Sequence, residues 1–138
     1  MSLTLTALTA QDKDTLRTAA YGAVSLMAAA DAAGKPHKTA TLGCIALTSA
    51  TGQVGHILAE KTRIKNLGGA STAALAEQVL PALAAAVELL QRHSPAEAAN
   101  FRITVAIAVE AAARAHQAEP GPALAAMARK ITDALDAA

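Results

Sequence analysis

The chain has 138 residues, of which 53% are hydrophobic, and its twelve basic and eleven acidic residues give a formal net charge of +1 at pH 7. This length fits a single domain, and the near-neutral charge argues against general binding of nucleic acid, which relies on an excess of Lys and Arg. The single cysteine, Cys44, excludes an intramolecular disulfide.

The N-terminal residues contain no basic segment followed by a continuous apolar run, so no secretory signal is predicted and a cytoplasmic location is expected. The first helix is predicted to begin near Thr9, because Asp12 follows three residues later. There its carboxylate can complete a capping box and interact favourably with the positive end of the helix dipole. Its apolar positions share one face at helical spacing: Leu16, Ala20, Val24 and Met27.

From Pro36 we expect one helix or a pair of helices, with a break near Thr51 and Gly52, because glycine weakens a helix. The stretch from Thr39 to Ala59 has no charged residue over about the 20 residues that a membrane span needs. Its Thr, Ser, Gln and His content favours a buried helix of a soluble domain, so no membrane association is predicted.

A linker is predicted over the sequence EKTRIKNLGG, residues 60–69. Its KTRIK segment could contact an anion or an acidic partner, but it lacks the interleaved aromatic residues that stack on bases, and a solvated linker is favoured. Ser71 is expected to open the next helix, and Pro81 is expected to kink or split it, because proline removes a backbone hydrogen bond. The apolar face of this helix comprises Leu75, Val79, Leu83, Ala86 and Leu90.

The clearest helix start is SPAEAANF, where Ser94 caps the helix, Pro95 fits its first position, and Glu97 can return the capping bond. A helix is predicted from Pro95 to His116. Its main apolar face comprises Phe101, Val105, Ala108 and Ala112, and Ile103 and Ile107 form a second row beside it. Such breadth predicts a central helix covered on more than one side. The last helix, after EPGP, has one apolar stripe: Leu124, Met127, Ile131 and Leu135.

These elements predict an all-α fold, a single helical domain over residues 1–138 with about five to seven helices. A shift of 85 residues aligns LRTAAYGAVSLMAAADAA, from Leu16, with FRITVAIAVEAAARAHQA, from Phe101, which suggests a faint pseudo-two-fold repeat. Much of the hydrophobic content is alanine, and Tyr21 is one of only two aromatic residues. The core is therefore expected to be thin, and a partner subunit in a homodimer is expected to bury further apolar surface.

The order of GAVSLMAAAD with a glycine shortly after, then SPAEAANFRITVAIAVEAAARAH and ALAAMARKITDAL, resembles the TerB-like group of bacterial proteins related to tellurite resistance. That resemblance implies a compact all-α bundle with an internal two-fold relation and an Ala-Asp-Gly element connected with metal binding. Asp31 is the only position that could take this acidic role, as the ligand of a divalent cation. The sequence departs from the pattern beside it, because two alanines separate Asp31 from Gly34, and Lys35 and Lys38 follow.

The same residues allow a second interpretation, in which Asp31 is a solvated side chain near a helix end capped by Gly34. The four histidines have no zinc-binding helix spacing and are predicted at the surface or at helix ends: His37, His56, His93 and His116. Cys44 has apolar neighbours, which predicts a buried and unreactive thiol. No phosphate loop, dinucleotide fingerprint or nucleophile elbow is present, so the chain is predicted not to be an enzyme and to need no organic cofactor.

Two functions are therefore favoured by the sequence, and an enzyme with an unfamiliar site ranks third, because no nucleophile and base are clustered. The resemblance implies an accessory protein of a bacterial stress or tellurite-resistance-type system, which binds a protein partner and senses an ion. The alternative is a helical carrier of a small hydrophobic ligand, because helices lined with alanine that fail to close tightly leave room between them.

Overall fold

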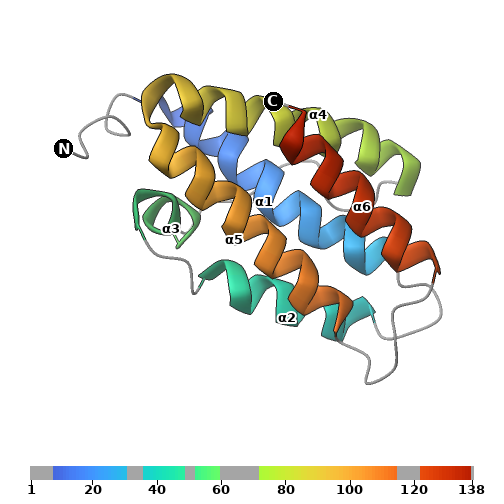
Figure 1. The fold of residues 1–138 in the computed structure, drawn as a ribbon. Helices are drawn as coiled ribbons and strands as arrows, with labels where there is room; N and C mark the ends of the chain where they lie inside the picture. The colour runs from blue at the N-terminus through green and yellow to red at the C-terminus, as the bar shows by residue number, and fades with distance from the viewer. Residues whose placement is uncertain (1–7, 31–35, 49–51, 60–71, 115–121, 138) are drawn as a thin grey trace.

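The computed structural model describes residues 8–30, 36–48, 52–59, 72–114 and 122–137. Within these ranges the chain forms six helices and no strand, which confirms the all-α prediction (Figure 1). The helices are α1 (Ala10–Ala30), α2 (Pro36–Thr48), α3 (Gly52–Ala59), α4 (Thr72–His93), α5 (Pro95–Ala113) and α6 (Pro122–Asp136).

Helices α1 and α5 form the centre of the bundle. Each of them packs against all five other helices, and the most extensive pairings are α1 with α4 and α5 with α2. Figure 1 shows α5 in front of α1, with α2 below α5 and α6 above it, while the short α3 lies beside the first half of α5.

The buried faces follow the predicted apolar stripes. All four predicted core positions of α1, all five of α4, the four on the main face of α5 and all four of α6 are buried. The core is built mainly from Leu, Val and Ala, with Phe101 its largest fully buried side chain. Alanine and glycine at the crossings allow the helix axes to approach closely, as two glycines show below.

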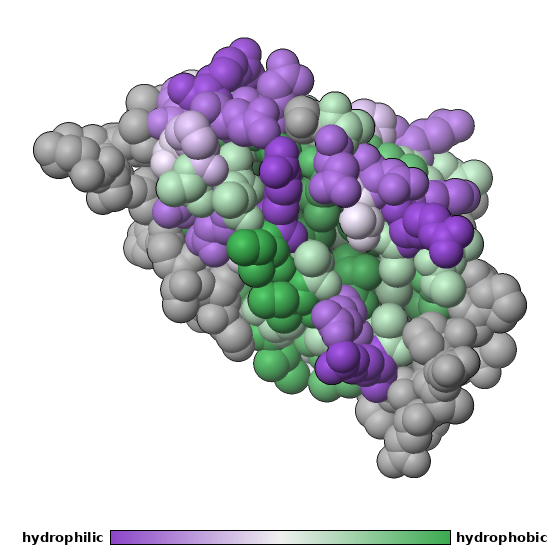
Figure 2. Space-filling view, viewed as in Figure 1, coloured by the Kyte–Doolittle hydropathy of each residue, from purple (hydrophilic) through white to green (hydrophobic). Residues whose placement is uncertain are grey.

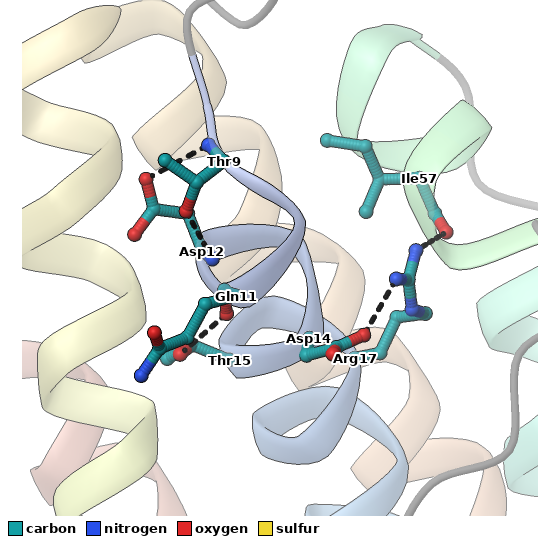
Figure 3. Close-up of polar contacts among 7 residues, drawn as sticks. All are labelled: Thr9, Gln11, Asp12, Asp14, Thr15, Arg17 and Ile57. Carbon is teal, nitrogen blue, oxygen red and sulfur yellow. Dashed lines mark hydrogen bonds and ion pairs between the residues drawn. The ribbon is translucent and has the colours of Figure 1, made fainter.

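The start of α1 is a reciprocal capping box, as predicted (Figure 3). The backbone N–H of Asp12 donates to Oγ1 of Thr9 over 3.0 Å, and the N–H of Thr9 donates to Oδ2 of Asp12 over 3.1 Å. Two of the N–H groups that a helix start leaves without partners are thereby satisfied.

The region after Pro36 forms two helices, because α2 ends at Thr48 and α3 begins at Gly52. The uncharged stretch from Thr39 to Ala59 is therefore divided between a helix of 13 residues and one of 8, each shorter than the roughly 20 residues of a span. Helix α4 continues through Pro81, so the predicted split there is wrong. Pro81 has no backbone N–H to donate to the carbonyl four residues before it. Because Pro81 is exposed, water can donate to that carbonyl instead.

One helix of the described ranges, Ala73–His93 within α4, is long and apolar enough to cross a membrane by length and composition. A core helix of a soluble protein meets the same criterion, and α4 buries Leu75, Val79, Leu83 and Leu90 against the other helices. The helix is thus weak evidence for a span, and the absence of membrane association stays a prediction.

Two glycines lie at close helix crossings. A Cβ atom added to Gly22 of α1 would lie 2.5 Å from Cγ2 of Val79 in α4. A Cβ atom added to Gly43 of α2 would lie 2.8 and 2.9 Å from the two Cγ atoms of Val24 in α1. Both glycines therefore serve close approach between helices, and α1 is tightly packed on two sides.

Candidate functional site

Helix α3 is held at its C-terminal end by two side chains of α1. Nη1 of Arg17 donates to the carbonyl of Ile57 over 3.2 Å, and the hydroxyl of Tyr21 donates to the carbonyl of Leu58 over 2.7 Å. These carbonyls lie in the last turn of α3, which leaves them without partners inside the helix. The positive charge of Arg17 also lies at the negative end of the helix dipole, so the contact combines a hydrogen bond with a favourable charge–dipole interaction.

Arg17 is 6% exposed, an unusual degree of burial for a guanidinium group. Its Nη2 forms an ion pair with Oδ1 of Asp14 over 2.7 Å, and the side chain of Asp14 is 58% exposed (Figure 3). The pair thus connects a buried cation to a solvated anion, while another hydrogen bond of Arg17 goes to α3. Arg17 is therefore a structural residue that attaches α3 to the central helix.

The opposite end of α3 is held by Glu97 of α5, whose Oε1 accepts the backbone N–H of Val54 over 3.1 Å. A carboxylate at a helix N-terminus is stabilised by the helix dipole and by the free N–H groups. The short α3 therefore has an acidic residue at its start and a basic residue at its end, each supplied by a different helix. We call Arg17, Tyr21 and Glu97 the α3 clamp.

The prediction for Glu97 is corrected by this contact. Oγ of Ser94 accepts the N–H of Glu97 over 3.4 Å and caps α5, as predicted. The carboxylate of Glu97 does not return to the N–H of Ser94, because that group already donates to the carbonyl of Leu90 at the end of α4 over 2.6 Å. The carboxylate is thus available for α3, and it also accepts the side-chain amide of Asn100 over 3.4 Å.

Replacing Glu97 with glutamine should lower the free energy of unfolding by about 1 kcal/mol, because the cap at α3 loses its charge but keeps its shape. Hydrogen exchange measured by mass spectrometry should show that the substitution accelerates exchange in α3 more than in α6, relative to the natural protein. The matched control is Glu88→Gln, which removes an exposed carboxylate from α4. Equal effects of the two substitutions on α3 would contradict this role for Glu97.

Tyr21 and Cys44 are two half-buried acidic groups at the junction of α1 and α2. Burial raises the pKa of the Tyr21 phenol above its ordinary 10.0, and Cys44 raises it further while Arg17 opposes the shift. Burial also raises the pKa of the Cys44 thiol above its ordinary 9.0. The thiol is therefore protonated at neutral pH, which is the opposite of an activated nucleophile. The expected burial of Cys44 is only partial.

The raised pKa values of both groups predict a loss of stability at alkaline pH. The unfolded chain releases these protons first, so the stabilisation is fully present below pH 9.0 and falls as pH rises through the folded-state pKa values. Urea unfolding from neutral pH to well above pH 10.0 should show this decline in the natural protein. It should be weaker in Tyr21→Phe and in Cys44→Ala, and weakest in the double variant. Parallel curves for all four proteins would contradict the assignment.

The exposed side of α5 carries the second structural feature. Ile103 and Ile107 are 58% and 53% exposed, and Ile45 of the neighbouring α2 is 55% exposed. Helix α5 is central and is covered by other helices on more than one side, as predicted, but the row of Ile103 and Ile107 is not one of the covered sides. We call Ile45, Ile103, Ile107 and the exposed Ala106 the isoleucine face. Figure 2 shows hydrophobic residues gathered over the middle of α5 and over α2, with hydrophilic residues above them and to their lower right.

Charged residues of α5 lie beside the isoleucine face. Arg102 is half-buried on α5, and its Nε is buried without a hydrogen-bond partner. Glu110, two helical turns later, is exposed and forms an ion pair with Arg114 one turn further on. Among the described residues no carboxylate pairs with Arg102. Both signs of charge thus flank an uncovered apolar surface.

The residue predicted as a metal ligand, Asp31, lies outside the described residues, as do Gly34 and the KTRIK segment. His116 also lies outside them, and the side chains of His37 and His56 are not described. His93 is the last residue of α4, as its position near a helix end predicted. In the described part of the chain, no group of three or more His, Cys, Asp or Glu side chains could hold a metal ion. The divalent cation at Asp31 stays a prediction.

Sequence patterns did not find the α3 clamp, because its contacts join residues that are 37 to 43 positions apart. A weak indication was available in Arg17, a cation at a position next to the apolar stripe of α1. Comparison of the chain with protein-family models, with curated proteins and with solved structures gives no match.

Proposed function

We propose that this chain is a non-catalytic helical protein that acts by binding a protein partner through the isoleucine face. The supporting observation is the group of three isoleucines, each more than half exposed, on two adjacent helices. Contiguous apolar surface on a soluble protein is a common mark of a site for another protein. The polar groups of the α3 clamp bind backbone within the fold, which leaves the isoleucine face as the better candidate for function.

An internal repeat is part of this proposal. Positions 85 residues apart are buried together in α1 and α5, as in the pairs Leu16 and Phe101, Ala20 and Val105, Ala23 and Ala108, Val24 and Val109, and Met27 and Ala112. Helix α1 starts at residue 10 and α5 at residue 95. Each of these central helices is followed by a helix that packs on the other, since α2 contacts α5 and α6 contacts α1.

The resemblance to TerB-like proteins supports a role as an accessory protein in the cytoplasm of a bacterium, within a stress or tellurite-resistance-type system. On this proposal Asp31 binds a divalent cation that modulates partner binding. Native mass spectrometry with added calcium or zinc tests this part, since Asp31→Asn should abolish a metal adduct of the natural protein. A chain that stays free of metal in both cases would refute ion binding and leave partner binding in place.

The alternative function, a carrier of a hydrophobic ligand, requires space between the helices. The crossings of α1 with α4 and with α2 are too close for an added Cβ atom at Gly22 or Gly43. Tight packing on two sides of a central helix favours a binding site at the surface, and the carrier ranks second.

Site-specific photo-crosslinking in the cells that make the protein tests the proposed function. A photoreactive amino acid at position 107 of α5 should give a covalent adduct to a partner polypeptide, either a different protein or a second copy of this chain. The matched control places the same amino acid at Arg129, which is exposed on α6. Adducts at position 107 and none at position 129 are expected. Equal or absent crosslinking at the two positions would refute a protein-binding role for the isoleucine face.

A further inference from the structure

Two oppositely charged residues of α5, Arg102 and Glu110, lie at equal distances from Ala106 along the helix. Arg102, Ala106 and Glu110 follow one another at intervals of four residues, so they form one ridge along the helix. Ile103 and Ile107 form the next ridge. Ala106 is thus the midpoint of a surface with a cation one turn before it and an anion one turn after it.

This pattern is complementary to itself. In two antiparallel copies of α5 related by a two-fold axis near Ala106, residue 102 of one copy lies opposite residue 110 of the other. Arg102 would then face the carboxylate of Glu110 in the other copy, and this pairing would occur twice. A two-fold interface requires a surface that is complementary to itself in this way.

The proposed repeat indicates that a helix belongs on this surface. The position 85 residues before Ile107 is Gly22, which is buried and in close contact with Val79 of α4. On α1 this side is therefore covered by a helix of the same chain. On α5 the equivalent side is exposed and carries isoleucine instead of glycine.

We propose that the partner covering the isoleucine face is a second copy of this chain, packed with its α5 antiparallel to the first. Ile103 and Ile107 of the two copies interdigitate around Ala106, and Arg102 pairs with Glu110 of the partner subunit. This inference rests on the proposed function and names its partner. The presence of both signs of charge beside the isoleucines favours this occupant over a membrane surface, which selects amphipathic helices with a basic polar face.

The test uses two single charge reversals, Arg102→Glu and Glu110→Arg, in the full chain. Sedimentation equilibrium of the natural protein should show a dimer, and each reversal should weaken it about tenfold, because each change places like charges opposite one another twice. An equimolar mixture of the two variants should form a heterodimer with the affinity of the natural dimer, because both opposite-charge pairs are restored there. Native mass spectrometry, with one variant isotopically labelled, measures the heterodimer directly.

The controls separate this interface from effects on folding. Arg129→Glu, a charge reversal on the exposed side of α6, should leave the dimer unchanged, whereas Ile107→Asp should abolish it while circular dichroism stays helical. A monomeric natural protein, or a statistical mixture with no preference for the heterodimer, would overturn the proposal. If crosslinking at position 107 nevertheless captures a different protein in cells, the proposed function stands and only the identity of its partner is wrong.

Discussion

Replacing Arg17 with alanine should lower the free energy of unfolding by about 3 kcal/mol, the larger of two strong effects expected in this protein. The carbonyl of Ile57 would lose a charged hydrogen-bond donor in a buried position. The volume of the side chain, which is 6% exposed, would also be left unfilled. Chemical denaturation followed by circular dichroism measures the total loss.

Two further variants separate the causes. Arg17→Met keeps most of the buried volume but removes the charge and the donors, so it should recover the packing part and still cost about 1.5 kcal/mol. Asp14→Asn removes an ion-pair partner of Arg17. Because the side chain of Asp14 is 58% exposed, this substitution should change the free energy of unfolding by less than about 1 kcal/mol. The expected loss of stability is largest for Arg17→Ala, smaller for Arg17→Met and smallest for Asp14→Asn.

Substitution of Arg17 should loosen α3 more than the rest of the fold. Arg17 binds the end of α3, so hydrogen exchange in Arg17→Met should accelerate in α3 while the core amides of α5 change only with global stability. A methionine variant as stable as the natural protein, with unchanged exchange in α3, would show that the clamp contributes no net stability.

Contacts close in sequence were predictable, and contacts distant in sequence were not. The capping box of Thr9 and Asp12 and the cap by Ser94 depend on residues three positions apart, so local preference is enough to identify them. The carboxylate of Glu97 was assigned to its own helix start. Its true partner is Val54, 43 positions away, and only the folded arrangement brings the two together.

The interpretation of α5 shows a second limit of the sequence. Helical periodicity identifies a row of apolar residues, but it does not say whether the same chain covers that row. Phe101 and Val105 are buried as predicted, whereas Ile103 and Ile107 belong to an equally apolar row that the single chain leaves exposed. The predicted metal ligand, Asp31, lies outside the described residues, so the candidate site on α5 and α2 differs from the one that the sequence suggested.

Replacing Gly22 with alanine should lower the free energy of unfolding by about 2 kcal/mol, although alanine is the better helix former by about 1 kcal/mol. The new Cβ atom would lie 2.5 Å from Cγ2 of Val79, which is fully buried and, as a β-branched residue in a helix, has one strongly preferred rotamer. Valine therefore cannot turn away, and α1 and α4 must separate along the most extensive contact of α1. Urea denaturation of the single variant measures this cost.

A double-mutant cycle decides whether this contact is the cause. Val79→Ala alone should cost roughly 2 kcal/mol through the cavity it leaves, but combined with Gly22→Ala it should cost clearly less than the sum, because the new methyl group occupies the vacated space. The matched control is Gly43→Ala, whose Cβ atom would meet Val24 at 2.8 Å, at the other close crossing of α1. Val79→Ala should give no such recovery with Gly43→Ala, since the nearest atoms to a Cβ at Gly43 belong to Val24. Additive costs in both cycles would mean that the cost of Gly22→Ala does not arise from the contact with Val79 and that the distance between α1 and α4 is set elsewhere.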